Sequence, residues 1–143
     1  MEKIKVLFLC TGNSCRSQMA EGFLRYLGKE DFEAYSAGTR PTRLNPLAVR
    51  AMKEKGIDIA GQHSQSADEF VGEPFDYIIT VCDHARETCP VFPGTAERPH
   101  WSLKDPAEAE GSDEERMPVF REIRDQIEKR IRDFITEQKN AGK

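Results

Sequence analysis

Long apolar runs, an excess of basic residues and a recognisable signal peptide are all missing from this 143-residue sequence. No apolar run approaches the roughly 20 residues that a membrane-spanning helix needs, so no membrane association is expected. The 25 acidic residues outnumber the 21 basic ones, which leaves a net charge of -4. Proteins that bind nucleic acid usually carry a basic surface, so nucleic acid is not an expected partner either.

Cysteine is also scarce, with four residues in the chain. Because Lys3 and Lys5 lead straight into a strand-length apolar run, no secretory signal is recognised, and a cytoplasmic location is expected. Disulfides rarely serve as structural braces in that compartment. Catalysis or metal binding is therefore the better expectation for the four cysteines, which are Cys10, Cys15, Cys82 and Cys89.

Size and composition predict a single globular domain over residues 1–143, since 38% of the residues are hydrophobic and 32% are charged. Residues 4–9 are almost entirely apolar, which is typical of a strand buried on both faces of a parallel sheet. The alternation of strands and helices predicts an α/β three-layer sandwich with a four-stranded parallel sheet. The expected strands are 4–9, 33–37, 77–82 and 100–103, and the expected helices are 17–27, 46–55, 67–70 and 113–139.

An apolar strand, a tight loop and the start of a helix succeed one another between Val6 and Ser17. The backbone amides of such a loop point one way and add to the positive end of the helix dipole, so the loop is expected to bind an oxyanion. Cys10, at the strand end, is the expected nucleophile, with a thiol pKa lowered by this cradle. Arg16 offers a planar fork of donors for two oxygens of a tetrahedral anion.

Other loop residues have expected roles as well. Gly12 would let the backbone approach the anion with a φ that other residues avoid, and Ser17 would cap the helix and direct its hydroxyl at the thiolate. The alternative without a function is a buried cysteine at a strand end with a surface arginine nearby. The strand before the loop and the helix after it disfavour this alternative. The predicted oxyanion-binding residues are Thr11, Gly12, Asn13, Ser14, Cys15, Arg16 and Ser17.

A second expected strand also ends at a cysteine, Cys82, and Cys89 follows seven positions later. The carboxyl ends of parallel strands share one edge of a sheet, so Cys10 and Cys82 could face the same crevice. A disulfide needs Cα atoms within about 7 Å, and one to two helical turns would hold Cys82 and Cys89 farther apart, so their pairing would require a rearrangement. The alternatives are two unrelated buried thiols or a zinc site, although a spacing of six intervening residues is unusual for zinc.

Residues 10–17 resemble the catalytic loop of the low-molecular-weight protein tyrosine phosphatase superfamily, which includes the thioredoxin-coupled arsenate reductases. The pair Cys82 and Cys89 resembles the redox segment of those reductases, and the similarity continues through His100–Trp101 and Asp105–Ala107. The phosphatase branch lacks the downstream cysteine pair and usually carries an aromatic residue after the aspartate and proline. Both features favour the arsenate reductase branch.

The resemblance implies a reaction sequence. The Cys10 thiolate attacks arsenate under Arg16, and Asp105 is the general acid for the departing oxygen. Cys82 then attacks Cys10 and releases arsenite, Cys89 attacks Cys82, and thioredoxin reduces the resulting Cys82–Cys89 disulfide. This scheme needs neither a metal nor an organic cofactor. It assigns no catalytic role to the other cysteine of the loop. The protein is expected to be a monomer.

In some relatives a potassium ion lies near the equivalents of Asn13, Glu21 and Ser36, and Asn13 is also expected to brace the loop. Here Gln65 stands where a carboxylate would complete that site, so at most a weak potassium site is expected.

The runner-up function is a phosphatase that forms a phosphocysteine at Cys10, and weak phosphatase activity is expected even of a reductase. A non-enzymatic thiol or metal sensor, which binds oxyanions and signals by a change of shape, is the third alternative.

Overall fold

The computed structural model describes residues 3–82, 94 and 96–141 of the chain. Among these residues, a parallel sheet of three strands lies at the centre, in the order β2–β1–β3. The first strand in the sequence is thus the middle strand of the sheet. The strands are β1 (Ile4–Cys10), β2 (Phe32–Gly38) and β3 (Tyr77–Thr80).

The register of the sheet brings the strand ends together. Cys10 of β1 is paired with Gly38 of β2, and Leu9 is paired with Thr80 of β3. The last five residues of β1 are buried, because neighbouring strands flank it on both sides and packed layers cover both faces of the sheet. Cys10 therefore ends the central strand at the edge where ligands bind in parallel sheets.

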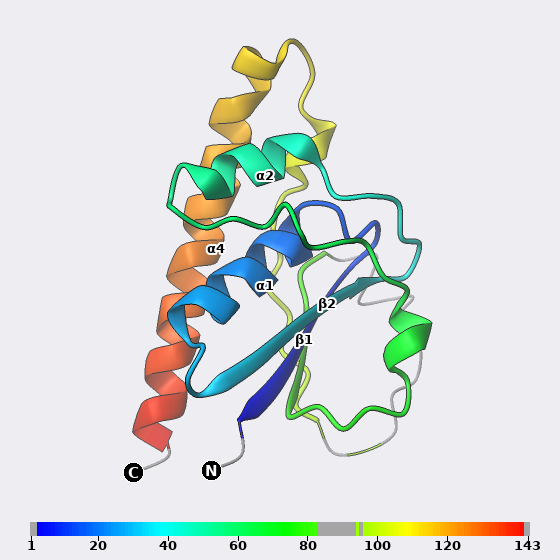
Figure 1. Ribbon diagram of the computed structural model, residues 1–143, viewed down its shortest axis with the longest axis vertical. Coiled ribbons are helices and arrows are strands. Elements are labelled where there is room, and N and C mark those ends of the chain that lie inside the picture. The colour runs from blue at the N-terminus through cyan, green and yellow to red at the C-terminus, as the bar shows by residue number, and fades with distance from the viewer. Residues whose placement is uncertain (1–2, 83–93, 95, 142–143) are drawn as a thin grey trace.

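The α-helices of the described residues lie on one face of the sheet (Figure 1). They are α1 (Arg16–Leu27), α2 (Pro46–Lys53) and α4 (Asp113–Ala141). The main core joins β1 to these helices through buried residues such as Phe8, Phe23 and Phe120. On the opposite face, Leu7 and Ile78 pack in a smaller cluster beside the 3₁₀ helix η1 (Ala67–Phe70). The predicted α/β fold with a parallel sheet is confirmed.

The predicted helices are confirmed with small shifts of their ends. Asn45 caps α2 by accepting a hydrogen bond from the Leu47 amide at 2.8 Å, and Pro46 is the first helical residue, as the sequence predicts. The long C-terminal helix continues to Ala141. The third strand ends at Thr80, two residues before Cys82.

The fourth strand, predicted at 100–103, is wrong, because only three strands are present in the described part of the chain. Residues 97–101 instead follow β3 with two isolated parallel bridges, Tyr77 to Glu97 and Thr80 to His100. Pro99 lies between these bridges, and proline has no amide to continue a ladder. The segment therefore lies where a fourth strand would lie without forming a continuous one.

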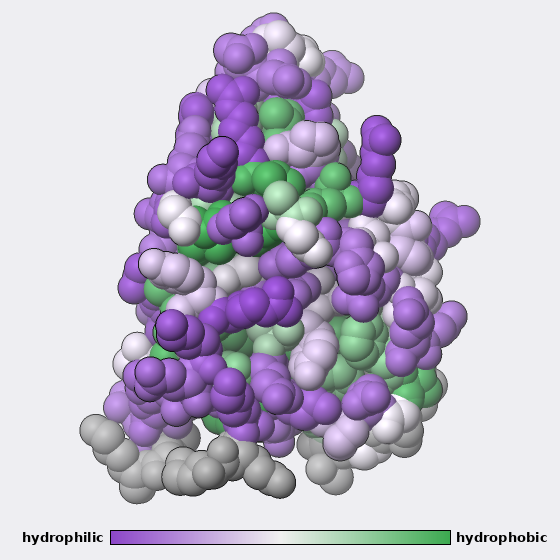
Figure 2. Space-filling view, in the orientation of Figure 1, coloured by the Kyte–Doolittle hydropathy of each residue, from purple (hydrophilic) through white to green (hydrophobic). Residues whose placement is uncertain are grey.

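The surface seen in Figure 2 is mostly hydrophilic, and its hydrophobic residues gather over α2 and beside η1. Within the described residues, every helix is too short or too polar to cross a membrane.

Candidate active site

The predicted oxyanion loop, residues 10–17, connects the end of β1 to the start of α1. Residues 39–45 run beside this loop, and four of their backbone amides donate to four of the loop carbonyls. Thr39, Arg40, Thr42 and Asn45 donate to the carbonyl oxygens of Cys10, Thr11, Gly12 and Ser14, at 3.1, 2.8, 3.0 and 3.0 Å, respectively.

The two remaining carbonyls of residues 10–15 are also engaged from outside the loop. The Asn13 oxygen accepts from the Gln18 side chain at 2.9 Å and from the Ser64 hydroxyl at 2.7 Å. The Cys15 oxygen accepts from the Met19 amide at 2.9 Å. All six carbonyl groups are thus held turned away from the centre of the loop.

The outward carbonyls determine where the loop amides point. In a trans peptide, the amide that follows a carbonyl points in the opposite direction, so the amides of residues 11–16 face the centre. Among the residues that the structure describes, none accepts a hydrogen bond from the backbone amides of residues 12–15. Such a ring of inward amides is an anion-binding nest, which is the cradle that the sequence predicts.

The left-handed backbone conformation of the loop lies at Asn13, with φ of 50°, so the prediction that placed it at Gly12 is wrong. Asn13 tolerates this conformation because its side chain is bonded on both sides. Its Nδ2 donates to the Ser17 hydroxyl at 2.8 Å, and its Oδ1 accepts from the Gln65 amide at 2.9 Å. The prediction that Asn13 braces the loop is confirmed.

Gly38 is a site residue that the sequence reasoning missed. A Cβ atom at Gly38 would lie 2.6 Å from the Thr11 carbonyl oxygen and 3.0 Å from the Asn13 amide nitrogen. The end of β2 can therefore approach the loop only with glycine at this position. The available signal was a glycine at the carboxyl end of a strand, beside the edge where the loop was expected.

Ser17 does not cap α1, contrary to the prediction. The helix begins at Arg16, no side chain caps its N-terminus, and the Ser17 hydroxyl accepts from Asn13 instead. The reason is geometric, because Ser17 is the second helical residue and its side chain cannot reach back over the first turn. The first amides of α1 are consequently left for an anion.

Arg16 and Asp105 meet beside the nest, as expected. Arg16 Nη1 donates to the Leu103 carbonyl at 2.9 Å, and Nη2 lies 3.6 Å from Asp105 Oδ2. The other carboxylate oxygen of Asp105 accepts from the Ala107 amide at 3.0 Å, which fixes it at the start of the 3₁₀ helix η2 (Pro106–Glu108). Arg16 Nε is buried and has no partner among the described residues.

The charge of Arg16 is maintained despite its burial. Burial alone would lower the pKa of the guanidinium, but the neighbouring Cys10 and Asp105 raise it above its ordinary value. A positive group whose Nε has no acceptor among the described residues therefore stands next to the ring of amides. This arrangement suits a tetrahedral oxyanion.

Cys10 and Cys82 are both buried thiols, and the Cys82 thiol lies close enough to Cys10 to raise its pKa. The Thr11 hydroxyl lies 3.3 Å from the Cys82 sulfur, so it contacts the second thiol rather than the first. The structure thus brings together two of the three cysteines of the expected relay. Cys89 lies outside the described residues.

The expected lowering of the Cys10 pKa is not found. The hydrogen bond with Cys82 and burial raise the pKa of the Cys10 thiol well above its ordinary value, and Arg16 and the Thr11 amide only oppose this shift. The loop amides and Arg16 alone would lower this pKa, but the second thiol beside Cys10 and burial outweigh them. Cys15 is buried as well, which raises its pKa to about 11, so it is a poor nucleophile.

The three residues of the expected potassium site, Asn13, Glu21 and Ser36, lie in one hydrogen-bonded network. The Ser36 hydroxyl donates to one Glu21 carboxylate oxygen at 2.5 Å, and Arg25 pairs with the other. The Asn13 Oδ1 atom already accepts from the Gln65 amide. The oxygens that would coordinate a cation are therefore bonded to protein donors, and a guanidinium neutralises the carboxylate, so these residues do not fit a potassium ion.

Known proteins resemble this chain in sequence and in fold. The family model described as low molecular weight phosphotyrosine protein phosphatase matches residues 5–143. The arsenate reductase of Halalkalibacterium halodurans is 53% identical over 135 residues, which cover 94% of this chain and 96% of that protein.

Two solved structures extend the comparison. An arsenate reductase in the phosphate binding state matches with a TM-score of 0.78 at 36% identity, covering 94% of this chain and 98% of that one. A thioredoxin-dependent arsenate reductase of Corynebacterium glutamicum matches with a TM-score of 0.75 at 28% identity, covering 97% of this chain and 63% of that one. The chain therefore belongs to the low molecular weight phosphotyrosine protein phosphatase family, within the part of that family that contains the arsenate reductases.

Proposed function

We propose that this protein reduces arsenate to arsenite and that thioredoxin returns it to the reduced state. The observation that carries this function is the contact between two thiols, Cys10 and Cys82, inside an oxyanion nest. Hydrolysis of a phosphate ester needs one thiol at this position. Reduction of As(V) to As(III) needs a second thiol, because two electrons must come from a dithiol that becomes a disulfide.

The first step uses the nest and Asp105. Arsenate is a tetrahedral oxyanion, which the inward amides and the unused donor of Arg16 suit. The Cys10 thiolate attacks arsenic and forms a sulfur–arsenic bond while one arsenic–oxygen bond breaks. Asp105, held 3.6 Å from Arg16, supplies the proton with which the departing oxygen leaves as water.

The thiol contact favours a strict order of attack. Before reaction, Cys10 and Cys82 compete for the same positive surroundings, which disfavours the ionisation of both together. Once the Cys10 sulfur is bonded to arsenic, that competition ends, and the Thr11 hydroxyl can donate to a thiolate at Cys82. Cys82 then attacks the Cys10 sulfur, the sulfur–arsenic bond breaks, and its electron pair leaves on arsenic as arsenite.

The last steps regenerate the nest. The Cys89 thiolate attacks Cys82, which forms a Cys82–Cys89 disulfide and releases the Cys10 thiolate. Thioredoxin then supplies two electrons to reduce that disulfide. The sequence resemblance around Cys82 and Cys89 supports this part, as does the thioredoxin dependence stated for the Corynebacterium relative.

The test is arsenate-dependent oxidation of reduced thioredoxin by the wild type, Cys82→Ser and Cys89→Ser proteins. Both variants should lose turnover, while both keep phosphate binding, which serves as the control for an intact nest. After one reaction with arsenate, peptide mapping of Cys89→Ser should show a Cys10–Cys82 disulfide. Retained thioredoxin-dependent turnover in both variants would refute the relay, and strong aryl-phosphate hydrolysis unaffected by either change would establish the phosphatase instead.

A further inference from the structure

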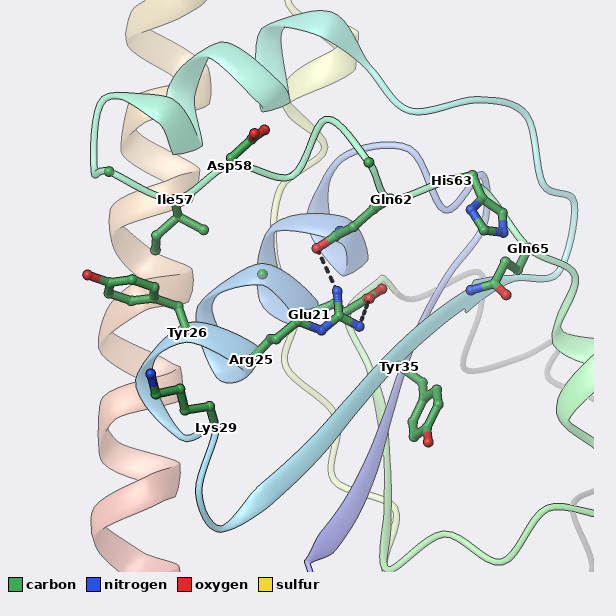
Figure 3. A pocket seen from close by; sticks show the side chains of 13 residues that line it. Glu21, Arg25, Tyr26, Lys29, Tyr35, Ile57, Asp58, Gln62, His63 and Gln65 are labelled. Carbon is green, nitrogen blue, oxygen red and sulfur yellow. Dashed lines mark hydrogen bonds and ion pairs between the residues drawn. The ribbon is translucent and has the colours of Figure 1, made fainter.

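A cavity of about 490 Å³ lies beside α1, outside the oxyanion nest (Figure 3). The Arg25 guanidinium lies between Glu21 and Gln62 in this cavity and interacts with both. Arg25 Nη2 also donates to the Ala34 carbonyl at 2.9 Å. This one side chain therefore ties α1 to β2 and to the segment that contains Gln62.

A first relay of hydrogen bonds leads from Arg25 to the oxyanion loop. Arg25 Nη1 donates to Gln62 Oε1 at 3.2 Å, and Gln62 Nε2 donates to Gln18 Oε1 at 2.8 Å. Gln18 is fully buried and donates to the Asn13 carbonyl at 2.9 Å. Only two glutamines thus separate the guanidinium from Asn13.

A second relay reaches the same residue by another route. Arg25 pairs with the buried Glu21 carboxylate, which accepts from the Ser36 hydroxyl at 2.5 Å. The Ser36 carbonyl accepts from Gln65 Nε2 at 3.3 Å, and the Gln65 amide donates to Asn13 Oδ1 at 2.9 Å. The two relays hold the carbonyl and the side chain of the one loop residue with a left-handed backbone.

Glu21 is only 5% exposed, and a buried carboxylate needs a charged or well-bonded partner to stay ionised. Burial raises the pKa of Glu21, and Ser36 and Arg25 act against that rise. Arg25 has a planar fork that reaches three acceptors at once, which a lysine ammonium on its flexible stem does not reproduce. The cation beside Glu21 is therefore part of the chain itself.

We propose that Arg25 is a positioning residue for the oxyanion loop, which fixes Asn13 through Gln62 and Glu21 and takes the place that a bound potassium ion would fill. This inference deepens the proposed function, because the loop that Arg25 positions is the proposed arsenate site. It predicts that oxyanion affinity depends on a side chain outside the nest.

The experiment compares Arg25→Met with Lys29→Met. Lys29 lines the same cavity, and its substitution by methionine removes the same charge. The Lys29 side chain makes no hydrogen bond or ion pair with the other described residues, so it serves as the matched control. Calorimetry with inorganic phosphate measures the affinity of the loop, and hydrogen exchange over a peptide covering residues 10–18 measures its rigidity. Arg25→Met should bind phosphate about tenfold more weakly, because small displacements of binding groups are costly, and its loop should exchange faster.

Lys29→Met should leave both measurements unchanged, and Arg25→Lys should restore only part of the phosphate affinity. If Arg25→Met does not fold, Gln62→Leu breaks the first relay while keeping the Arg25–Glu21 pair, and it should show a smaller loss. Unchanged phosphate affinity and loop exchange in the folded variant, or stabilisation of the wild type by KCl over NaCl at equal ionic strength, would overturn the proposal. Failure of the wild type to reduce arsenate would refute the proposed function but leave the exchange comparison decisive for Arg25.

Discussion

Arg16 and Arg124 are two arginines with the same burial, each 8% exposed, in very different surroundings. Arg124 on α4 donates from Nε to Asp125 at 2.9 Å and from Nη1 to the Ala51 carbonyl and to Glu54 at 3.0 and 2.8 Å. Arg16 has a buried Nε with no partner among the described residues, and it stands next to a ring of inward amides. Burial alone therefore does not distinguish these two arginines, whereas the unpartnered Nε of Arg16 and its place beside the nest do.

The difference has an energetic meaning. A buried donor without an acceptor costs roughly 1 to 3 kcal/mol, so the surroundings of Arg16 are less stable than they could be. Folds accept such a cost at binding sites, where a ligand supplies the missing acceptor. An anion in the nest should therefore supply the hydrogen-bond acceptor that Arg16 Nε lacks. At Arg124 the donors named above already have acceptors, so a ligand would add no comparable stabilisation.

The largest expected effect is that of Arg16→Met on function. The substitution removes the planar fork and its charge, so kcat/KM for arsenate should fall about 1,000-fold or more, and phosphate affinity should fall with it. Coupled turnover and calorimetry measure these losses. If the variant kept phosphate affinity close to that of the wild type, the unused donor of Arg16 would have no part in binding.

Arg124→Met should reverse this pattern. It leaves the Ala51 carbonyl without its donor and Glu54 with one partner fewer, so the free energy of unfolding should fall by about 2 kcal/mol. Urea denaturation gives that value, and phosphate affinity of the folded variant is the control. A loss of phosphate affinity as large as that of Arg16→Met would remove the distinction between the two arginines.

Gly38→Ala should produce an intermediate effect on both properties. Its Cβ would lie 2.6 Å from the Thr11 carbonyl oxygen, and overpacking of this kind costs about 1 to 3 kcal/mol. The added atom also displaces the loop, so phosphate should bind more weakly.

Gly61→Ala is the matched control, because a Cβ there meets nothing within 4 Å. It should leave the urea midpoint and phosphate affinity unchanged or slightly improve stability. Equal behaviour of the two alanine variants would show that the approach of β2 to the loop is not tight.

Gly38 also shows how far sequence reasoning reaches in this protein. The order strand, loop, helix and the residue types Cys10 and Arg16 are local information, and they predicted the nest, its nucleophile position and its clamp. The need for glycine at position 38 arises only when β2 is placed beside β1 in register. That contact joins residues far apart in the chain, so a glycine at a strand end can mark the position but does not show what the glycine contacts.

Two of the corrected predictions have the same origin. The left-handed φ lies at Asn13 rather than Gly12 because Gln65 and Ser17 bond the Asn13 side chain. The Cys10 pKa rises rather than falls because β3 brings Cys82 into contact with it. Both errors concern a neighbour supplied by the tertiary structure. The errors at Ser17 and at the fourth strand have local causes instead, the position at which α1 begins and the proline at position 99.

The smallest expected effect is that of Glu54→Gln, and it depends on pH. Arg121 donates to both carboxylate oxygens of Glu54, and together with Arg124 it lowers the pKa of this group to about 2. The ordinary value is about 4.3, so the stabilisation is complete above pH 4.3 and is lost as the pH falls from there toward 2. The side chain is 35% exposed, so solvent screening keeps the contribution small.

The urea midpoint of Glu54→Gln should therefore lie slightly below that of the wild type at pH 7, and the two should converge as the pH falls below 4. Added salt should reduce the gap at pH 7, because exposed ion pairs are screened. A gap that stayed constant down to pH 2 would mean that glutamine is disfavoured for a reason other than lost charge. Phosphate affinity at pH 7 should be the same in both proteins, because the Glu54 cluster joins α2 to α4 and none of its donors belongs to the nest.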